Sequence, residues 1–153
     1  MSVRSARVED APRLAELAGE LGYPTDAAQI RSRLVRLADL PGHWIGVAVA
    51  GAVAGARAVQ GWVHVAQCIT LETGEYAEIL GLVVASQARR GGVGRQLVAA
   101  AERWSGDLGV TSIAVRSNLV RAEAHHFYPA LGYEPAKSQR VYAKMLPARL
   151  ATP

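Results

Sequence analysis

The sequence predicts an α/β (α+β) protein, a mixed and mostly antiparallel sheet flanked by helices. Three observations lead to this class. Residues 10–40 carry apolar side chains at helical spacing, residues 44–84 are rich in Val, Ile, Trp and Ala with glycine between them, and residues 93–146 alternate between these two patterns. No linker or repeat interrupts the chain, so one domain is expected over residues 1–146, with a frayed tail at 147–153.

Two helices open the chain. Asp10 is placed to cap the first, with Pro12 in its first turn, and apolar residues follow at helical spacing until Gly22 and Pro24 break the pattern. Thr25 or Asp26 caps the second helix, which carries an apolar stripe and ends at Pro41-Gly42. Each helix therefore has one face suited to covering a sheet.

The strand region begins at residue 44. Gly51 is the expected turn of a first hairpin, but the segment 48–56 is of low complexity and leaves the strand register open. Residues 62–72 are expected to form a strand. The sequence Thr73-Gly74-Glu75 then makes a turn, and residues 76–84 return as the next strand.

Helices and strands alternate in the last third. A helix is predicted over 93–108 and a short strand near 113–116. A second helix follows over 121–131, ended by Gly132, and the alternating Val141, Ala143 and Met145 predict a final strand.

Composition excludes several classes of protein. Half of the 153 residues are apolar and a fifth are charged, as in ordinary globular domains, and no apolar run approaches the length of a membrane span. One cysteine and no signal-peptide pattern fit a cytoplasmic protein. The net charge of +4 comes from basic residues spread along the chain, so no nucleic acid is expected as a partner. No cluster has metal-ligand spacing, so no metal is expected.

The turn at residues 87–97, QARRGGVGRQL, carries the clearest functional signal. It follows an apolar strand and precedes a helix, and three glycines let backbone approach a ligand while three arginines add positive charge. Unpaired N–H groups and the helix dipole favour an anion there, so the turn predicts a phosphate or pyrophosphate site. A Walker loop would end in Gly-Lys-Ser or Gly-Lys-Thr, and a dinucleotide fingerprint would open a βαβ unit near the start of a domain. Neither fits.

Two motifs in order resemble the GCN5-related N-acetyltransferases. The first is Arg89-x-x-Gly92-x-Gly94, the family's acyl-CoA signature. The second lies in SNLVRAEAHHFYPALGY at 117–133, where Asn118 and the run from Ala124 through Phe127, Tyr128, Leu131 and Gly132 to Tyr133 match the family pattern. The resemblance covers residues 2–146 and is specific over 76–133. Arg90 departs from the commonest form, which has glycine at that position.

The resemblance implies the acetyltransferase fold and acetyl-CoA as co-substrate. The turn would hold the pyrophosphate, and the pantetheine arm would lie where the strands at 82–84 and 113–116 splay apart. The Val84 N–H would face the thioester oxygen as an oxyanion donor. The expected cofactor-binding residues are Leu82, Val83, Val84, Arg89, Arg90, Gly91, Gly92, Val93, Gly94, Arg95, Asn118 and Phe127.

Two residues are expected to carry the chemistry. Tyr128 matches the family's tyrosine near the cofactor sulfur and would protonate the leaving thiolate, or it packs beside Phe127. Glu78 stands eleven residues before Arg89, the separation of the general base in the histone-acetyltransferase branch. Strand alternation predicts that Glu78 shares a face with Leu80, Leu82 and Val84. It would deprotonate the amine through water, attract the cationic amine, or be only a solvated charge.

The acceptor is a small-molecule or protein amine. Trp62 and His64 share a face of one strand and are candidates for the acceptor pocket, or they are sheet positions without this role. Glu72, near the following hairpin, would attract a cation. A homodimer is expected through strand edges at 44–72 and 139–146. The alternatives are a catalytically silent acyl-CoA sensor of the same fold and, suggested only by the basic pI, a nucleic-acid-associated module.

Overall fold

The computed structural model describes residues 1–51, 55, 58–116 and 122–149, without the side chains of 122–124. The chain divides into two compact units, Met1–Ser117 and Asn118–Pro153, and each is described by itself. That residues 1–146 act as one domain stays a prediction. In the described ranges, no helix is long and apolar enough to cross a bilayer.

The first unit is built on a five-stranded sheet in the order β1-β2-β3-β4-β5. Neighbouring strands are antiparallel except for β4 and β5, which are parallel. The predicted fold class is therefore confirmed. The strands are β1 (Ser2–Ser5), β2 (His43–Val49), β3 (Val59–Thr70), β4 (Gly74–Val84) and β5 (Ile113–Val115).

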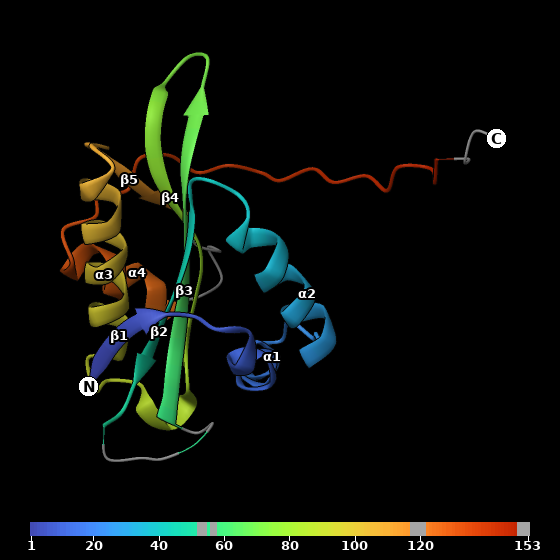
Figure 1. Ribbon diagram of the computed structural model, residues 1–153. Coiled ribbons are helices and arrows are strands. Elements are labelled where there is room, and N and C mark those ends of the chain that lie inside the picture. The colour runs from blue at the N-terminus through green and yellow to red at the C-terminus, as the bar shows by residue number, and fades with distance from the viewer. Residues whose placement is uncertain (52–54, 56–57, 117–121, 150–153) are drawn as a thin grey trace. The chain divides into compact units, whose positions relative to one another are not determined.

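Helices cover both faces of this sheet (Figure 1). On one face lies α3 (Val93–Asp107), and a Cβ atom built on Gly61 of β3 would meet Leu97 and Val93 of this helix at 3.1 and 3.3 Å. On the other face lie α1 (Ala11–Glu20) and α2 (Ala27–Ala38). Their Leu14, Leu17 and Leu34 form one buried cluster with Val47 and Val83 of the sheet.

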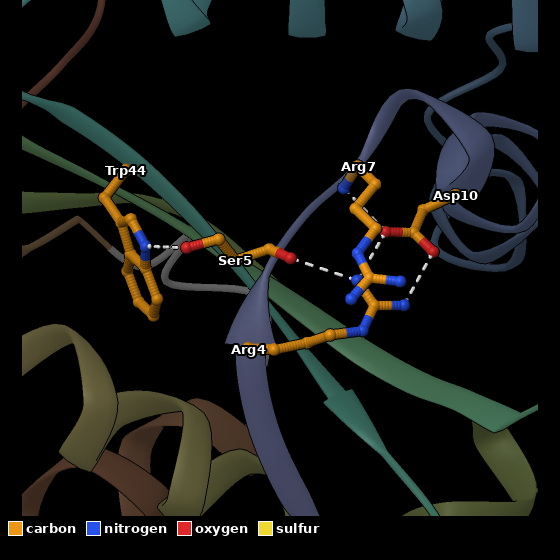
Figure 2. Close-up of polar contacts among 5 residues, drawn as sticks. All are labelled: Arg4, Ser5, Arg7, Asp10 and Trp44. Carbon is orange, nitrogen blue, oxygen red and sulfur yellow. Dashed lines mark hydrogen bonds and ion pairs between the residues drawn. The ribbon is translucent and has the colours of Figure 1, made fainter.

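Helix capping followed one prediction and departed from another. Asp26 caps α2, as its carboxylate accepts the Gln29 N–H at 2.8 Å. Asp10 is the N-cap residue of α1, but its side chain makes no capping bond to that helix. Its carboxylate instead accepts hydrogen bonds from the two terminal guanidinium nitrogens of Arg4, at 2.8 and 2.9 Å, and from the backbone N–H of Arg7, at 2.7 Å (Figure 2). These bonds hold the short 3₁₀ helix η1 (Val8–Asp10) beside β1.

The strand β1 was absent from the sequence prediction. Only one of its four residues, Val3, is apolar, so it carries no visible alternation. It pairs with β2 from Ser2 opposite Val49 to Ser5 opposite Gly46. The Trp44 indole N–H donates to the Ser5 hydroxyl at 2.9 Å and adds a side-chain contact to this edge (Figure 2).

One irregularity in β4 changes which residues share a face. His64 lies opposite Gly81 and Val65 opposite Ile79, so Leu80 is an extra residue without an opposite partner, as in a β-bulge. Because of this extra residue, even-numbered side chains point to one face of the sheet before the bulge and to the other face after it. The bulge therefore separates the half of β4 that leads into the glycine turn from the half that carries Glu78.

The second unit contains α4 (Ala122–Ala130), which ends near Gly132 with φ of 93°. The predicted final strand at 139–146 is wrong, because residues 134–149 have no regular secondary structure. Val141, Tyr142 and Met145 are 89, 87 and 92% exposed. An alternating sequence forms a strand only where another strand supplies hydrogen-bond partners, and the described residues supply none to this segment.

Candidate active site and acyl-CoA site

The glycine turn connects β4 to α3 through the 3₁₀ helix η3 (Ser86–Ala88). Gly92 is the N-cap residue of α3, with φ of 84°, a conformation that favours glycine. It has no side chain with which to cap the helix, and the Gln96 N–H is the one that reaches the Gly92 carbonyl. The N–H groups of Val93, Gly94 and Arg95 thus stand before the first helical hydrogen bond, where an anion is favoured.

Arg90 adopts a left-handed backbone conformation, with φ of 68°. This is the position where the family's commonest signature has glycine, and the backbone shape explains that preference. Among the described residues, Arg90 is the non-glycine residue with positive φ. The chain therefore keeps the loop conformation at a cost in strain and gains a cation at the turn.

The three arginines of the turn point to solvent, since Arg89, Arg90 and Arg95 are all exposed. A hollow of about 430 Å³ opens beside the turn and is lined partly by Gln87, Ala88, Gly91 and Val93. Positive charge and a helix N-terminus thus meet at the turn, while none of the three arginines lines the hollow beside it. This arrangement fits a pyrophosphate better than a neutral ligand.

The strand end before the turn has one edge open in the described residues. On the β3 side, Leu82, Val83 and Val84 lie opposite Val63, Trp62 and Gly61. On the β5 side, pairing covers only Ala77 to Ile79, and β5 ends at Val115. Backbone groups of residues 80–84 on that side have no strand partner among the described residues.

Glu78 faces the other way from the predicted set. It lies opposite Ala66, whereas Leu82 and Val84 lie opposite Val63 and Gly61 on the α3 face. Residues directly opposite in an antiparallel pair share a face, so the bulge at Leu80 puts Glu78 on the α1/α2 face. The predicted grouping of Glu78 with Leu80, Leu82 and Val84 is wrong for this reason.

The Glu78 carboxylate is buried and paired. Its Oε1 lies 3.4 Å from Arg116 Nε, just after β5, and the Arg116 side chain is itself exposed. Cys68 lies two residues from Ala66 on the same face. Burial and the negative charge of Glu78 raise the pKa of the Cys68 thiol, so it stays protonated and is not an activated nucleophile.

Two histidines form a hydrogen-bonded pair on this same face. His43 Nδ1 and His64 Nε2 are 3.0 Å apart, and the ring centroids are 5.2 Å apart. Burial and the neighbouring His43 lower the pKa of His64 from 6.5 to about 4. His64 is therefore neutral at physiological pH. His43 also lines a cavity of about 400 Å³ between α2 and the edge formed by β1 and β2.

Two of the three predicted acceptor residues share the Glu78 face. Trp62, His64 and Ala66 occupy every second position of β3 and therefore share a face, and Ala66 lies opposite Glu78. The Trp62 ring lies over Gly81, where a built Cβ would come within 2.8 Å of it. Glu72 is not brought to this site. It lies in the turn between β3 and β4, beyond Gly74, which itself is about 13 Å along the strand from Glu78.

Tyr128 lies in the second unit, within α4. Its ring makes edge-to-face contacts with Phe127 and Tyr133, with centroids 4.9 and 5.7 Å apart. Its carbonyl accepts the Leu131 and Tyr133 N–H groups, at 3.0 and 3.1 Å, where the helix ends. These contacts fix the Phe-Tyr motif locally. Asn118 lies outside the described residues.

Sequence reasoning missed His43 and Arg116 as site residues. Both meet their partners across strands, His43 from β2 and Arg116 from the end of β5. The signal would have been the register of β2 against β3, which sets His43 opposite Ala66. Because the segment 48–56 is of low complexity, that register could not be predicted from the sequence.

Residues 9–133 match the sequence profile of the acetyltransferase (GNAT) family. The chain therefore belongs to the GNAT acetyltransferase family, and the resemblance found in its motifs is confirmed. No curated protein matches the chain by sequence.

Solved structures share the whole fold at low sequence identity. An aminoglycoside 6'-N-acetyltransferase from Acinetobacter haemolyticus is 17% identical with a TM-score of 0.77, covering 95% of this chain and 99% of its own. The aminoglycoside N-acetyltransferase AAC(6')-Iy, solved with CoA, is 18% identical with a TM-score of 0.80, covering 94% and 93%. A protein described as a transcriptional regulator from Bacillus halodurans is 20% identical with a TM-score of 0.78, covering 94% and 99%.

Proposed function

We propose that this protein transfers the acetyl group of acetyl-CoA to a primary amine. The observation that carries the proposal is the glycine turn of a GNAT-family chain, where three exposed arginines at 89–95 accompany the uncapped start of α3. Membership of the GNAT family supports acetyl transfer. The uncapped helix start and the arginines of the turn support binding of the co-substrate's pyrophosphate there.

The rest of the co-substrate would follow β4. The pantetheine arm is an extended chain with amide groups, so it suits the edge of Leu82–Val84 on the β5 side as an added strand would. This requires β4 and β5 to splay beyond Ile79, and the Val84 N–H then serves as oxyanion donor. Phe127 and Asn118 complete the proposed binding set.

Two side chains carry out the proton transfers of the proposed reaction. The thioester supplies the activated acetyl group. A lysine-like amine has a pKa of about 10.4 and is protonated at neutral pH, so one proton must leave before attack. Glu78 removes that proton through a water, while Arg116 holds the carboxylate in place. The Tyr128 hydroxyl protonates the sulfur as the thiolate leaves.

The acceptor is a small cationic amine in this proposal. The α1/α2 face of the sheet carries the Glu78 carboxylate, which attracts a cation by its charge. It also carries the Trp62 ring, whose face attracts a cation through a cation–π interaction. The aminoglycoside acetyltransferases among the structural relatives act on amine-bearing molecules and support this class.

Calorimetry tests the anion site directly. Arg89→Glu reverses a charge at the turn and is expected to weaken acetyl-CoA binding at least about tenfold. Arg103→Glu is the matched control, an exposed arginine within α3 and away from the turn. Equal affinity in the two variants contradicts the proposed site.

A turnover screen tests the reaction. Release of free CoA thiol is measured with aminoglycosides, polyamines, amino acids and a lysine peptide. Thiol release that depends on one amine class supports acetyl transfer. Tight binding of acetyl-CoA with no thiol release across the whole panel supports the silent sensor instead, the role nearest to the relative described as a transcriptional regulator.

A further inference from the structure

We propose that His64 and His43 form a proton path that leads from the Glu78 side of the sheet to the cavity beside α2. The inference rests on the proposed function, since it concerns the proton that the acceptor amine gives up. It is carried by the order of the residues across the sheet. Glu78 is on β4, His64 on β3 and His43 on β2, all on one face.

The first step of the path spans a small gap. Glu78 lies opposite Ala66, and His64 is two residues further along β3. The backbone positions of Ala66 and His64 are therefore about 7 Å apart along the strand. Ala66 separates them with only a methyl group, and Leu80 leaves the ladder at this point. One water is the right size to bridge a carboxylate and an imidazole across such a gap.

The second step is already in place. His64 Nε2 and His43 Nδ1 are at hydrogen-bond distance, 3.0 Å. The outer nitrogens, His64 Nδ1 and His43 Nε2, have no hydrogen-bond partner in the part of the chain that the structure describes. Outward transfer has His64 Nδ1 accept a proton while its Nε2–H passes to His43, and His43 Nε2–H releases to water.

The direction of transfer follows from the environment. Because burial and the adjacent His43 lower the pKa of His64 to about 4, His64 passes a proton on and does not retain it. His43 stands at the cavity of about 400 Å³, which has room for several waters. The path therefore runs from a buried carboxylate to solvent.

Other titratable groups lie near this path. Tyr76 and Cys68 share the sheet face, and Arg116 pairs with Glu78. Arg7 and Asp39 line the cavity together with His43. The carboxylate of Asp39 favours arrival of a proton at the cavity end, and the guanidinium of Arg7 opposes its accumulation there.

The proton balance closes. The acceptor arrives as an ammonium and loses one proton through Glu78, His64 and His43 to water. Its nitrogen then forms the new C–N bond while the C–S bond breaks, and the sulfur takes the Tyr128 proton. The second proton of the amine restores the Tyr128 hydroxyl through solvent. The products are an N-acetyl amide, the CoA thiol and one released proton.

The test compares single-turnover rates of His64→Gln, His43→Gln and the double variant with the parent, using the best amine from the screen. Each single variant is expected to lose at least about tenfold at pH 7, with acetyl-CoA affinity unchanged. The double variant should lose no more than the larger single loss, because the two rings act in series. His125→Gln, an exposed imidazole of the second unit, is the matched control and should keep the parental rate.

Added imidazole separates a proton path from a structural role. Imidazole at tens of millimolar should restore part of the rate in His64→Gln and leave the parent unchanged, since a small base in the vacated space replaces the lost ring. Parental rates in both single variants, or a loss that imidazole does not restore, overturn the path. Absence of thiol release by the parent itself instead overturns the proposed function, so the two failures are distinct.

Discussion

At the scale of single residues, His64 links the site to acid stability. The unfolded chain takes up a proton on this ring near pH 6.5, whereas the folded protein takes it up near pH 4. Between these values the unfolded state binds more protons, so stability falls as pH drops through this window. Above pH 6.5 the contribution is fully present.

His64→Gln should flatten this part of the stability curve. Urea unfolding at pH 7.5 and pH 4.5 gives the loss on acidification for the parent and the variant. His64 accounts for at most about 3 kcal/mol of the loss in the free energy of unfolding on acidification. The actual share is smaller, because the ring is only partly buried and solvent screens its charge. Equal losses in the two proteins would show that His64 is not held neutral.

Tyr128 offers a second prediction at this scale. Tyr128→Phe keeps the ring contacts with Phe127 and Tyr133 and removes only the hydroxyl. Acetyl-CoA affinity should change little, while single-turnover rates should fall by about 10² to 10⁴, the usual range for a positioned acid. Parental rates in this variant would leave packing as the role of Tyr128 and water as the proton donor.

At the scale of elements, the glycine turn combines the proposed anion site with backbone strain. Arg90 holds a φ of 68° that glycine adopts without cost. Arg90→Gly should raise the free energy of unfolding by about 1 kcal/mol, since relief of strain outweighs the added freedom of the unfolded chain. The loss of one cation at the turn should weaken acetyl-CoA binding at low salt.

Thermal unfolding and calorimetry of Arg90→Gly check both effects together. Arg90→Ala is the control, because it removes the charge and keeps the Cβ atom that causes the strain. It should lose affinity to the same degree without the gain in stability. A glycine variant less stable than the alanine variant would contradict the account of the strain.

Long helices and the strand–turn–helix unit could be predicted because their signals are local. Asp26, the start of α3 at Gly92 and the end of α4 near Gly132 can each be inferred from a few adjacent residues. The face of Glu78 could not, because it depends on one extra residue, Leu80, in the pairing with β3. β1 is too short and polar to show a period, and the segment at 139–146 has the period but no strand beside it.

At the scale of the whole molecule, that C-terminal segment bears on assembly. It exposes Val141, Tyr142, Met145 and Leu146 in one short stretch, which is costly for a lone chain in water. Among the described residues of the first unit, β5 has a paired strand on one side only, at the end of the sheet order. Exposed apolar segments and open strand edges favour contact between copies.

We therefore expect a homodimer. Light scattering on the full chain should give the mass of two chains at micromolar concentration. Val141→Lys with Met145→Lys should shift it toward one chain, because burying two lysines without partners is unfavourable. Lys137→Glu, an exposed charge before this stretch, is the control and should leave the mass unchanged. A parental mass of one chain would rule out this assembly.

The extra residue in β4 has a consequence for how such proteins diversify. On the turn side of Leu80, backbone groups of β4 are the proposed edge for the acyl-CoA that the family's reactions share, while Glu78, on the other side of the bulge, is the proposed contact to the acceptor amine. A change of side chain on the Glu78 side leaves the strand's hydrogen-bonding edge beyond the bulge untouched. In this proposal a point mutation can change the acceptor contact, whereas losing one residue at the bulge would shift the alternation by one position and move Glu78 to the α3 face, with Leu82 and Val84.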